Sequence, residues 1–250
     1  MPKLVDIYRV IKVARNWWNL IPVTMGVWNQ TVIEFRNGLR FNYSHQLFSI
    51  EHFLEQPYRI ADVKNRVVVD IGAFSGDSAI FFAWRGALKV YAFEPVPAAF
   101  KMAVSNLELN GIQNVKMFNE AVGFSEGEFA IKEGETGCPS FSPLAHASQE
   151  PKGQRIRVRS FEALVGELKP ENAVLKMDCE GCEYEILLRI KDELLLPFAQ
   201  IILEYHNGAD NLLNRLAEAG YETCPLDVRG NVLALPTHPI GLLYAKRTGN

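Results

Sequence analysis

The stretch VVVDIGAFSGD, from Val67 to Asp77, decides the fold class of this chain. Its three successive valines are typical of a short strand that is buried on both faces. Asp70 ends the apolar run, Gly72 and Gly76 follow, and an apolar segment with helical character begins at Ser78. Glycine lets the backbone turn tightly and lets another group approach the main chain. The order strand, glycine loop, helix predicts the first turn of a doubly wound α/β domain.

The spacing D-x-G-x-x-x-G differs from the common nucleotide-binding motifs. Ala73 and Phe74 interrupt the G-x-G-x-x-G of dinucleotide-binding folds, and no lysine follows Gly76 as it would in a P-loop. The carboxylate of Asp70 would repel a pyrophosphate but suits a ligand with positive charge. S-adenosyl-L-methionine carries an ammonium and a sulfonium group and no phosphate, so it fits this loop. The alternative is a tight strand–helix turn that binds nothing.

Length and composition indicate one α/β domain with modest additions. The chain has 250 residues, of which 48% are hydrophobic and 22% charged, as in ordinary globular proteins. Its formal net charge of −3 argues against nucleic acid as a partner, although a local basic patch stays open. No apolar run reaches the roughly 18 residues of a membrane span. The N-terminus also lacks the apolar core of a signal peptide, so a cytoplasmic location is expected.

Residues 1–60 are expected to form an extension, and residues 61–250 the main domain. Apolar residues recur at helical spacing over residues 3–21, which include two tryptophans. This helix could dock on its own domain or lie on a membrane surface. Alternation around Asn37-Gly38 predicts a hairpin over Thr31 to Tyr43, and a second helix follows to Tyr58. The extension could act as a lid, a substrate platform or a cover for a sheet edge.

The main domain alternates strands and helices, which predicts a mostly parallel seven-stranded sheet with helices on both faces. The Gly-, Pro- and Ser-rich stretch from Gly134 to Gly153 reads as a long irregular loop. Ser160 is a plausible N-cap for a short helix. Strands are expected at residues 67–71, 88–93, 115–118, 128–132, 155–158, 173–177, 201–203, 221–224, 232–235 and 242–245, with antiparallel pairing at the end.

The four cysteines do not form a disulfide scaffold, but Cys179 and Cys182 make a C-x-x-C pair. A zinc site would require Cys138 and Cys224 as further ligands. A redox pair or a simple disulfide is another reading. Two small, half-buried thiols are the favoured interpretation.

Polar residues follow every strand of the predicted core, at the edge where open α/β sheets bind ligands. Glu94 lies about 20 residues past the glycine loop, where a carboxylate can accept hydrogen bonds from both ribose hydroxyls. Asn119 or Glu120 would meet the adenine amino group, and Phe74 and Val96 could pack on the ligand. The residues expected to bind the cofactor are Asp70, Gly72, Ala73, Phe74, Ser75, Gly76, Glu94, Pro95, Val96, Asn119, Glu120 and Ala121.

The ends of two later strands supply the expected acceptor side. Asp178 and Glu180 follow one strand, and Glu204 and His206 follow the next. Transfer to a hydroxyl requires alignment and a base, and His206, which titrates near neutrality, is a natural candidate. Asp178 or Glu180 could serve if burial raised its pKa. The four residues could instead hold a divalent metal, although no metal is expected.

Five segments in order, VVVDIGAFSGDSAIFFA, VYAFEPVP, NEAVG, LKMDCEGCEYEIL and IILEYH, resemble the FkbM family of S-adenosylmethionine-dependent methyltransferases. The resemblance covers residues 65–206, and its most specific part is K-x-D-x-E-G-x-E, from Lys176 to Glu183. It implies a Rossmann-like fold and O-methylation of a hydroxyl on a small molecule or sugar. By position it also implies that Asp70, Gly72 and Gly76 contact the methionine part of the cofactor.

Two other functions stay open at this point. One is an RNA methyltransferase that binds RNA through its N-terminal region, which the net charge disfavours. The other is a catalytically silent module that binds the cofactor and interacts with partners through that region. The resemblance does not explain the N-terminal extension, and the chain departs from the family in having Cys182 beside Cys179, which leaves a redox or metal role open. The oligomeric state is not readable from the sequence.

Overall fold

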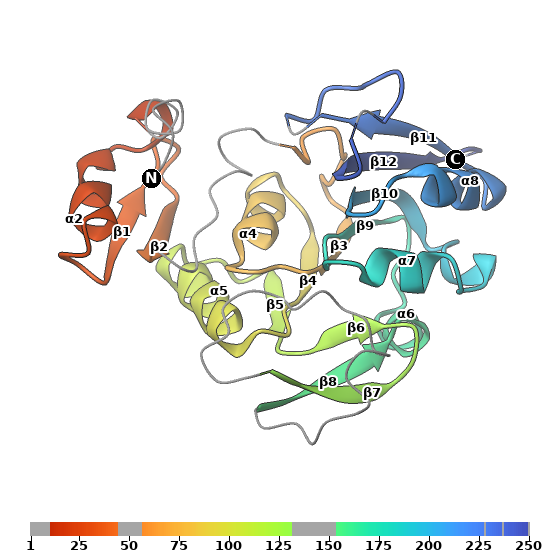
Figure 1. The fold of residues 1–250 in the computed structure, drawn as a ribbon, viewed down its shortest axis with the longest axis horizontal. Coiled ribbons are helices and arrows are strands. Elements are labelled where there is room, and N and C mark those ends of the chain that lie inside the picture. The colour runs from red at the N-terminus through yellow and green to blue at the C-terminus, as the bar shows by residue number, and fades with distance from the viewer. Residues whose placement is uncertain (1–10, 45–56, 132–153, 228, 237, 250) are drawn as a thin grey trace.

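The computed structural model describes residues 11–44, 57–131 and 154–249, apart from residues 228 and 237. A seven-stranded sheet forms the centre, and a two-stranded hairpin and a three-stranded sheet lie beside it (Figure 1). The strands are β1 (Gln30–Glu34), β2 (Arg40–Ser44), β3 (Val67–Ile71), β4 (Lys89–Phe93), β5 (Val115–Phe118), β6 (Ala121–Gly123), β7 (Gly127–Ile131), β8 (Gln154–Ser160), β9 (Ala173–Met177), β10 (Phe198–Tyr205), β11 (Tyr221–Leu226) and β12 (Gly241–Arg247). The helices are η1 (Trp17–Asn19), α2 (Leu20–Thr24), α4 (Asp77–Trp84), α5 (Pro97–Leu109), α6 (Phe161–Leu168), α7 (Cys182–Leu187), η3 (Asp192–Leu194) and α8 (Asp210–Glu218).

The central sheet has the order β11-β12-β10-β9-β3-β4-β5, and β12 alone runs antiparallel to its neighbours. The mostly parallel seven-stranded sheet is therefore confirmed, with the antiparallel pairing at its end. The strand expected over residues 232–235 is wrong, since Val232 makes only an isolated bridge to Leu226. Pro236 and Pro239 follow at once and lack the N–H groups that longer pairing requires.

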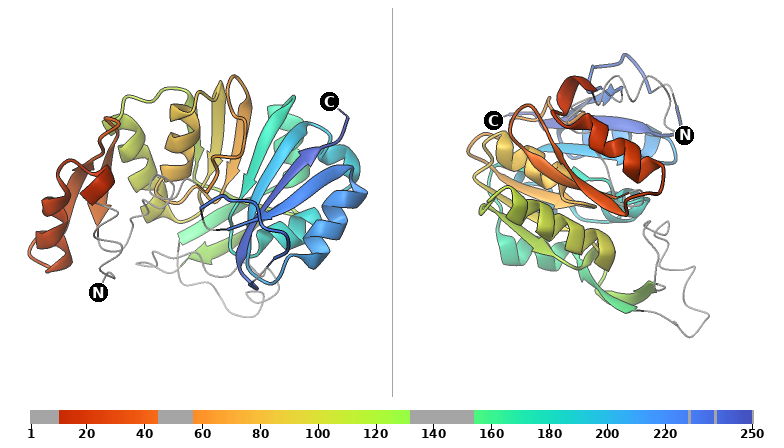
Figure 2. Two further views of the ribbon diagram at one scale, coloured as in Figure 1. Left: turned by 90° about the horizontal axis from the view of Figure 1, so that it is seen from above. Right: turned by 90° about the vertical axis from the view of Figure 1, so that its left-hand side faces the viewer.

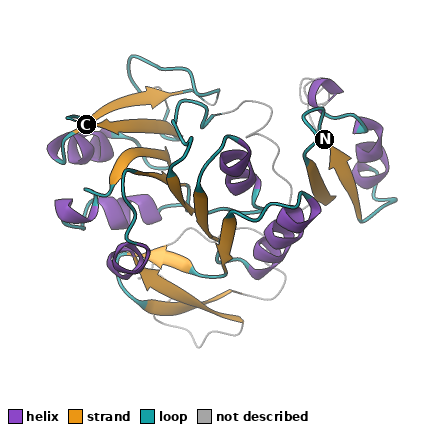
Figure 3. Ribbon diagram, turned by 180° about the vertical axis from the view of Figure 1, so that it is seen from behind, coloured by secondary structure: helices purple, strands orange, loops and turns teal. Residues whose placement is uncertain are grey.

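Helices cover both faces of this sheet, as the view from behind also shows (Figure 3). Side chains alternate along each strand, so neighbours on one strand enter different cores. Val68 packs in a cluster with α4 and the N-terminal hairpin. Val69 packs in the opposite cluster, to which α6, α7 and α8 contribute. Both faces of β3 are thus buried, as its run of valines predicts.

The N-terminal helix expected over residues 3–21 is interrupted in its described part. Ala14 forms a bridge to Phe35, and two short helical pieces, η1 and α2, follow. The side chain of Asn16 explains the break, because its amide donates to the carbonyl of Val32 at 2.9 Å and accepts from the N–H of Glu34 at 2.8 Å. A short amide side chain that bonds to the backbone competes with helix formation. Residues 3–10 lie outside the described part.

The hairpin around Asn37-Gly38 is confirmed as β1 and β2, and it packs on α5. The N–H of Asn42 donates to the buried Asn106 side chain at 2.8 Å. The side-chain amide nitrogen of Asn106 in turn donates to the carbonyl of Ser75 in the glycine loop at 2.9 Å. Figure 2 shows the hairpin and α2 at one end of the molecule. The second predicted N-terminal helix falls largely on residues 45–56, outside the described part.

The strands expected at residues 128–132 and 155–158 do not join the central sheet. They form β7 and β8, which pair with β6 in the separate three-stranded sheet. Ser160 caps α6 as expected, since its hydroxyl accepts the N–H of Ala163. The long loop from Gly134 to Gly153 lies outside the described part. Among the described residues, no helix has the length and apolar character needed to cross a bilayer.

Substitution of Gly72 by alanine is expected to destabilise the fold by more than about 3 kcal/mol. Gly72 has a φ of +80°, and a Cβ there would lie 1.7 Å from the backbone oxygen of Asp178. Gly166 is the matched control, because a Cβ there meets nothing within 4 Å and α6 would gain helix propensity. Urea unfolding should show a lower free energy of unfolding for Gly72→Ala and a slightly higher one for Gly166→Ala. Equal free energies of unfolding for the two variants would contradict the close packing at Gly72.

Candidate functional site

A buried ion pair lies at the carboxyl edge of the two central strands. Lys176 Nζ lies 3.0 Å from Asp70 Oδ1, and both side chains are fully buried. The second carboxylate oxygen of Asp70 accepts the hydroxyl of Ser78 at 2.7 Å. Burial alone would lower the pKa of Lys176, but the carboxylates of Asp70 and Asp178 outweigh burial and raise it. Lys176 is therefore a permanent cation beneath the glycine loop.

This lysine also fixes the glycine loop in place. Its Nζ donates to the carbonyl oxygen of Gly72. On the other side of the loop, the N–H groups of Gly72 and Ala73 donate to the carbonyl of Phe93, both at 3.0 Å. Gly76 has a φ of +81°, and a Cβ there would lie 2.9 Å from Cβ of Ala103 on α5. Packing against the protein itself is thus sufficient to require both glycines.

Glu94 lies where the sequence predicts it, at the end of β4 and under the glycine loop. One carboxylate oxygen accepts the N–H of Phe74 at 2.8 Å, and the other accepts the N–H of Val96 at 2.7 Å. Burial raises the pKa of Glu94 to about 7, even though these two hydrogen bonds favour the charged form. Each oxygen keeps a second lone pair that can accept a ribose hydroxyl.

Of the other residues expected around the cofactor, Asn119 faces the edge that carries Glu94, and Glu120 faces the three-stranded sheet. The side-chain amide of Asn119 donates to the carbonyls of Glu94 and Pro95, at 2.9 and 3.0 Å, and so belongs to the same edge. Glu120 turns toward the small sheet, where it accepts from Arg159 at 2.7 Å and pairs with Arg157 at 3.6 Å. Ala73, Ser75, Val96 and Ala121 are buried.

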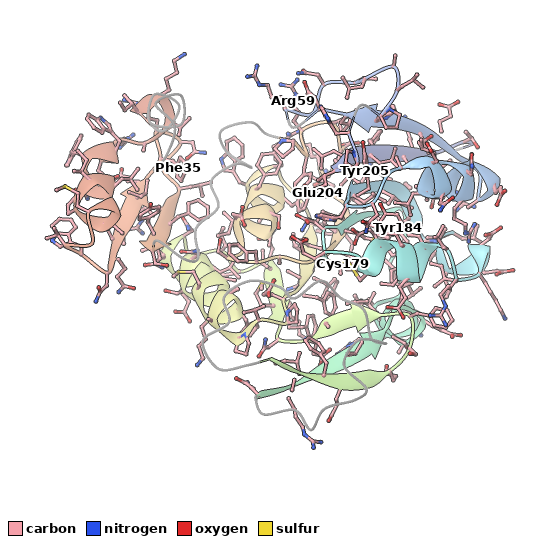
Figure 4. The ribbon with its side chains drawn as sticks, in the orientation of Figure 1. Phe35, Arg59, Cys179, Tyr184, Glu204 and Tyr205 are labelled. Carbon is pink, nitrogen blue, oxygen red and sulfur yellow. A yellow bond between two sulfur atoms is a disulfide. The ribbon has the colours of Figure 1, made fainter. Side chains whose placement is uncertain are left out.

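The expected acceptor residues come together at the adjoining edge of β9 and β10. Asp178, Glu204 and His206 each offer a ligand atom, and these atoms lie within 4.8 Å of one another. Figure 4 shows Glu204 and Cys179 at this edge. Oxygen and imidazole ligands at this spacing could hold a divalent cation. Lys176 Nζ already supplies positive charge here, 4.0 Å from Asp178 Oδ2.

His206 is held by two carboxylates. Its Nδ1 lies 2.8 Å from the fully buried Glu183, and its Nε2 lies 3.5 Å from Glu180. The hydrogen bond to Glu183 and the nearby acids raise the pKa of His206 to about 9. At neutral pH the ring is therefore an imidazolium, which has no free lone pair to accept a proton.

Glu204 titrates close to neutrality instead. Burial, together with the charge of Asp178, raises its pKa to about 7, although the imidazolium of His206 opposes the shift. A carboxyl group with this pKa is half ionised at pH 7 and can accept a proton from a bound hydroxyl. Tyr58, whose hydroxyl lies 3.4 Å from Asp178 Oδ2, borders the same group of acids.

Cys179 and Cys182 form a disulfide, so the favoured interpretation as two thiols is corrected. The two cysteines bracket the turn that leads into α7, which brings their Cα atoms to 5.5 Å. While these two sulfurs are bonded to each other they cannot act as zinc ligands, and Cys138, another ligand of the zinc alternative, lies outside the described part. Cys179 Sγ also lies 3.1 Å from Glu183 Oε2, so the disulfide abuts the carboxylate that holds His206.

Lys176, Ser78 and Tyr58 are site residues that the prediction did not include. A signal existed for Lys176, because it is the one charged residue in the buried strand AVLKM and lies two positions before Asp178. Charges that are buried in a central strand require a partner. No comparable sequence signal marks Tyr58, which comes from a distant segment.

Replacement of Lys176 by methionine is expected to cost about 3–5 kcal/mol of folding free energy, because Asp70 would remain as a buried, unpaired charge. Removal of both charges in Asp70→Asn/Lys176→Met should recover part of this loss. Chemical denaturation of the two variants measures the difference. If the free energy of unfolding of Lys176→Met were within about 1 kcal/mol of that of the unmodified protein, the ion pair would not be needed for stability.

The chain is similar to a family model, to a curated protein and to several solved structures. The family model described as Methyltransferase FkbM domain matches residues 70–223. Methyltransferase 1 from Beauveria bassiana (strain ARSEF 2860) is 26% identical over an alignment of length 165 that covers 57% of this chain and 66% of that protein. The chain therefore spans just under two thirds of this relative.

Among solved structures, SMU.776, assigned as a methyltransferase and complexed with SAH, has a TM-score of 0.50 at 10% identity. The likeness covers 87% of this chain and 56% of SMU.776, and it shows the fold alone. A ribosomal protein L11 methylase from Lactobacillus delbrueckii subsp. bulgaricus gives a TM-score of 0.46 at 16% identity, over 81% of each chain. The match to the family model extends over more than half of the chain, and the chain belongs to the FkbM methyltransferase family.

Proposed function

We propose that this protein transfers the methyl group of S-adenosyl-L-methionine to a hydroxyl oxygen of a small molecule or sugar. The observation that carries the proposal is the cluster of Asp178, Glu204 and His206, whose polar atoms lie within 4.8 Å of one another, and in which burial beside Asp178 raises the pKa of Glu204 to about 7. Hydroxyl acceptors need a base at the moment of transfer, and the ideal base has a pKa near the working pH. Membership in the FkbM family supports methyl transfer as the reaction.

The cofactor is proposed to lie along the edge formed by the glycine loop and the ends of β4 and β5. Glu94 would accept the ribose hydroxyls, and the carboxylate of Asp70 would contribute negative charge near the methionine part. Asn119 would border the adenine. Glu120 is a weaker candidate for this role, because its carboxylate is already paired with Arg159.

On the acceptor side, three residues would have separate roles in a single methyl transfer step. When bound, S-adenosylmethionine supplies a methyl group on a positively charged sulfur. Glu204 would take the hydroxyl proton as the acceptor oxygen forms its bond to the methyl carbon, and the bond from carbon to sulfur breaks. Asp178 would orient the hydroxyl, and the imidazolium of His206 would steady the negative charge of the neighbouring carboxylates. His206 is thereby a positioning residue, and Glu204 is the proposed base.

Glu94→Gln is expected to weaken the binding of S-adenosylmethionine at least tenfold. The amide would replace one acceptor oxygen with an N–H₂ group that faces a backbone N–H, so both the loop contact and the ribose contact suffer. Titration calorimetry with S-adenosylmethionine, S-adenosylhomocysteine and NAD measures this. Glu108→Gln, on the exposed side of α5, is the matched control. Binding of NAD alone would overturn the cofactor assignment.

At saturating S-adenosylmethionine, where the ionisation of Glu94 does not limit cofactor binding, the rate of transfer is expected to rise with pH through a midpoint near 7 and then level off, because Glu204 accepts a proton only when it is ionised. Glu204→Gln should remove this rise and slow transfer by about 10²–10⁴-fold. His206→Gln should shift the midpoint upward, because the imidazolium lowers the pKa of Glu204. Transfer of a labelled methyl group to a panel of hydroxyl compounds provides the readout.

The control for this profile is Glu222→Gln, at an exposed position of β11, which should keep the wild-type curve. A rising limb that disappears in His206→Gln but persists in Glu204→Gln would reassign the base. Loss of methyl transfer in EDTA and its recovery with Mg²⁺ would show that a bound metal ion, and not Glu204 acting as a base, activates the acceptor hydroxyl. Cofactor binding without transfer to any acceptor would favour a silent binding module.

A further inference from the structure

The outer side of the N-terminal segment is apolar and exposed. Five large apolar side chains there form what we term the outer N-terminal face. They are Trp18, Ile21, Met25, Val27 and Trp28, which are 54%, 49%, 72%, 68% and 46% exposed. The described part of the chain has 12 such exposed residues, and five of them fall within these 11 positions. Soluble proteins rarely expose this many large apolar side chains within so short a segment without a use for them.

The short helices η1 and α2 are apolar on both sides, not on one. Their inner side packs on the protein, where Trp17 and Leu20 lie against the core and Val23 is buried. Their outer side carries Trp18, Ile21 and Met25, at a spacing that repeats every three to four residues. A surface helix normally turns polar residues outward, and a helix that is apolar all round is usually covered by something else.

The backbone holds this outer side in place. Asn16 ties the start of η1 to β1, through hydrogen bonds with Val32 and Glu34. The N–H groups of Val27 and Trp28 both donate to the carbonyl of Pro22 at the other end, at 2.8 and 3.1 Å. Figure 2, in its right-hand view, shows the helix in front of the hairpin, at the end of the molecule. The five side chains therefore project from one firmly anchored unit.

The charge of this unit has the opposite sign to the rest of the chain. Its residues, 11–44, contain four basic residues and one acidic residue, a net charge of +3, whereas the whole chain has a formal net charge of −3. No acidic residue occurs from position 11 to position 33. Arg15 is paired with Glu34 at 3.1 Å, whereas Arg36 donates its guanidinium to the backbone carbonyls of Lys12 and Ile11.

We propose that the outer N-terminal face seats this enzyme on an anionic phospholipid bilayer. Tryptophan prefers the boundary between headgroups and acyl chains, and aliphatic side chains beside it enter the apolar layer. The basic residues of the same unit are attracted to anionic headgroups. Nucleic acid would also attract these cations, but the most exposed members of the face, Met25 and Val27, are aliphatic and offer no surface for base stacking.

Vesicle flotation with the full chain tests this proposal independently of methyl transfer. The protein is expected to float with vesicles of phosphatidylcholine and phosphatidylglycerol, and to float much less with phosphatidylcholine alone. Binding should fall as salt is raised. Trp18→Gln/Met25→Gln should lower the partition coefficient by about tenfold or more, because two apolar anchors are lost. The exposed Trp84 on α4, at 46% exposure, provides the matched control Trp84→Gln.

Four outcomes would overturn the proposal. The first is no flotation with either kind of vesicle. The second is an equal loss of vesicle binding in the Trp84→Gln control and in the double variant. The third is concentration-dependent self-association in sedimentation that the double variant abolishes, which would make the face an interface between copies of this chain. The fourth is release from anionic vesicles by a single-stranded RNA oligonucleotide that binds the wild type but not the double variant. Circular dichroism of each variant verifies that the fold is intact.

Discussion

The contact between Asp70 and Lys176 is the constraint on which the centre of this molecule depends. The two residues are register partners on β3 and β9, the strands in the middle of the sheet. A shift of one residue would turn Lys176 to the other face and leave two unpaired charges in the core. The pair therefore fixes the register, and with it the relative positions of the glycine loop and Asp178.

The two halves of the site differ in how they hold charge. On the side proposed to hold the cofactor, Glu94 is buried and accepts two backbone N–H groups, so its carboxylate is built into the turn between β4 and α5. On the acceptor side, acids outnumber cations, and Glu183 and His206 form a fixed pair beneath them. Among the acids on this side, Glu204 is the one whose pKa is raised to about 7, so it can exchange a proton near neutral pH.

The central sheet and the edge at which the polar residues meet could be predicted from the sequence, because both follow from local patterns. Buried valine runs mark parallel strands, and strand ends in such a sheet fall on one edge. The side to which Glu120 turns could not be predicted, because Arg157 and Arg159 come from a strand more than 30 residues later. The protonation of His206 was equally hidden, since it depends on Glu183 being buried beside it. The break in the N-terminal helix depends on a hydrogen bond from Asn16 to a later strand.

Asn106 gives the N-terminal extension a significance for truncation and domain design. One end of its buried amide receives the hairpin at Asn42, and the other end holds the glycine loop at Ser75. Phe35 and Phe41 of the extension also share a core cluster with Val68 and Phe82. A protein cut at residue 60 would leave half of a buried amide without partners and would expose part of that core. The hairpin and the glycine loop are therefore connected through one buried side chain, and a domain boundary at residue 60 would cut through that connection.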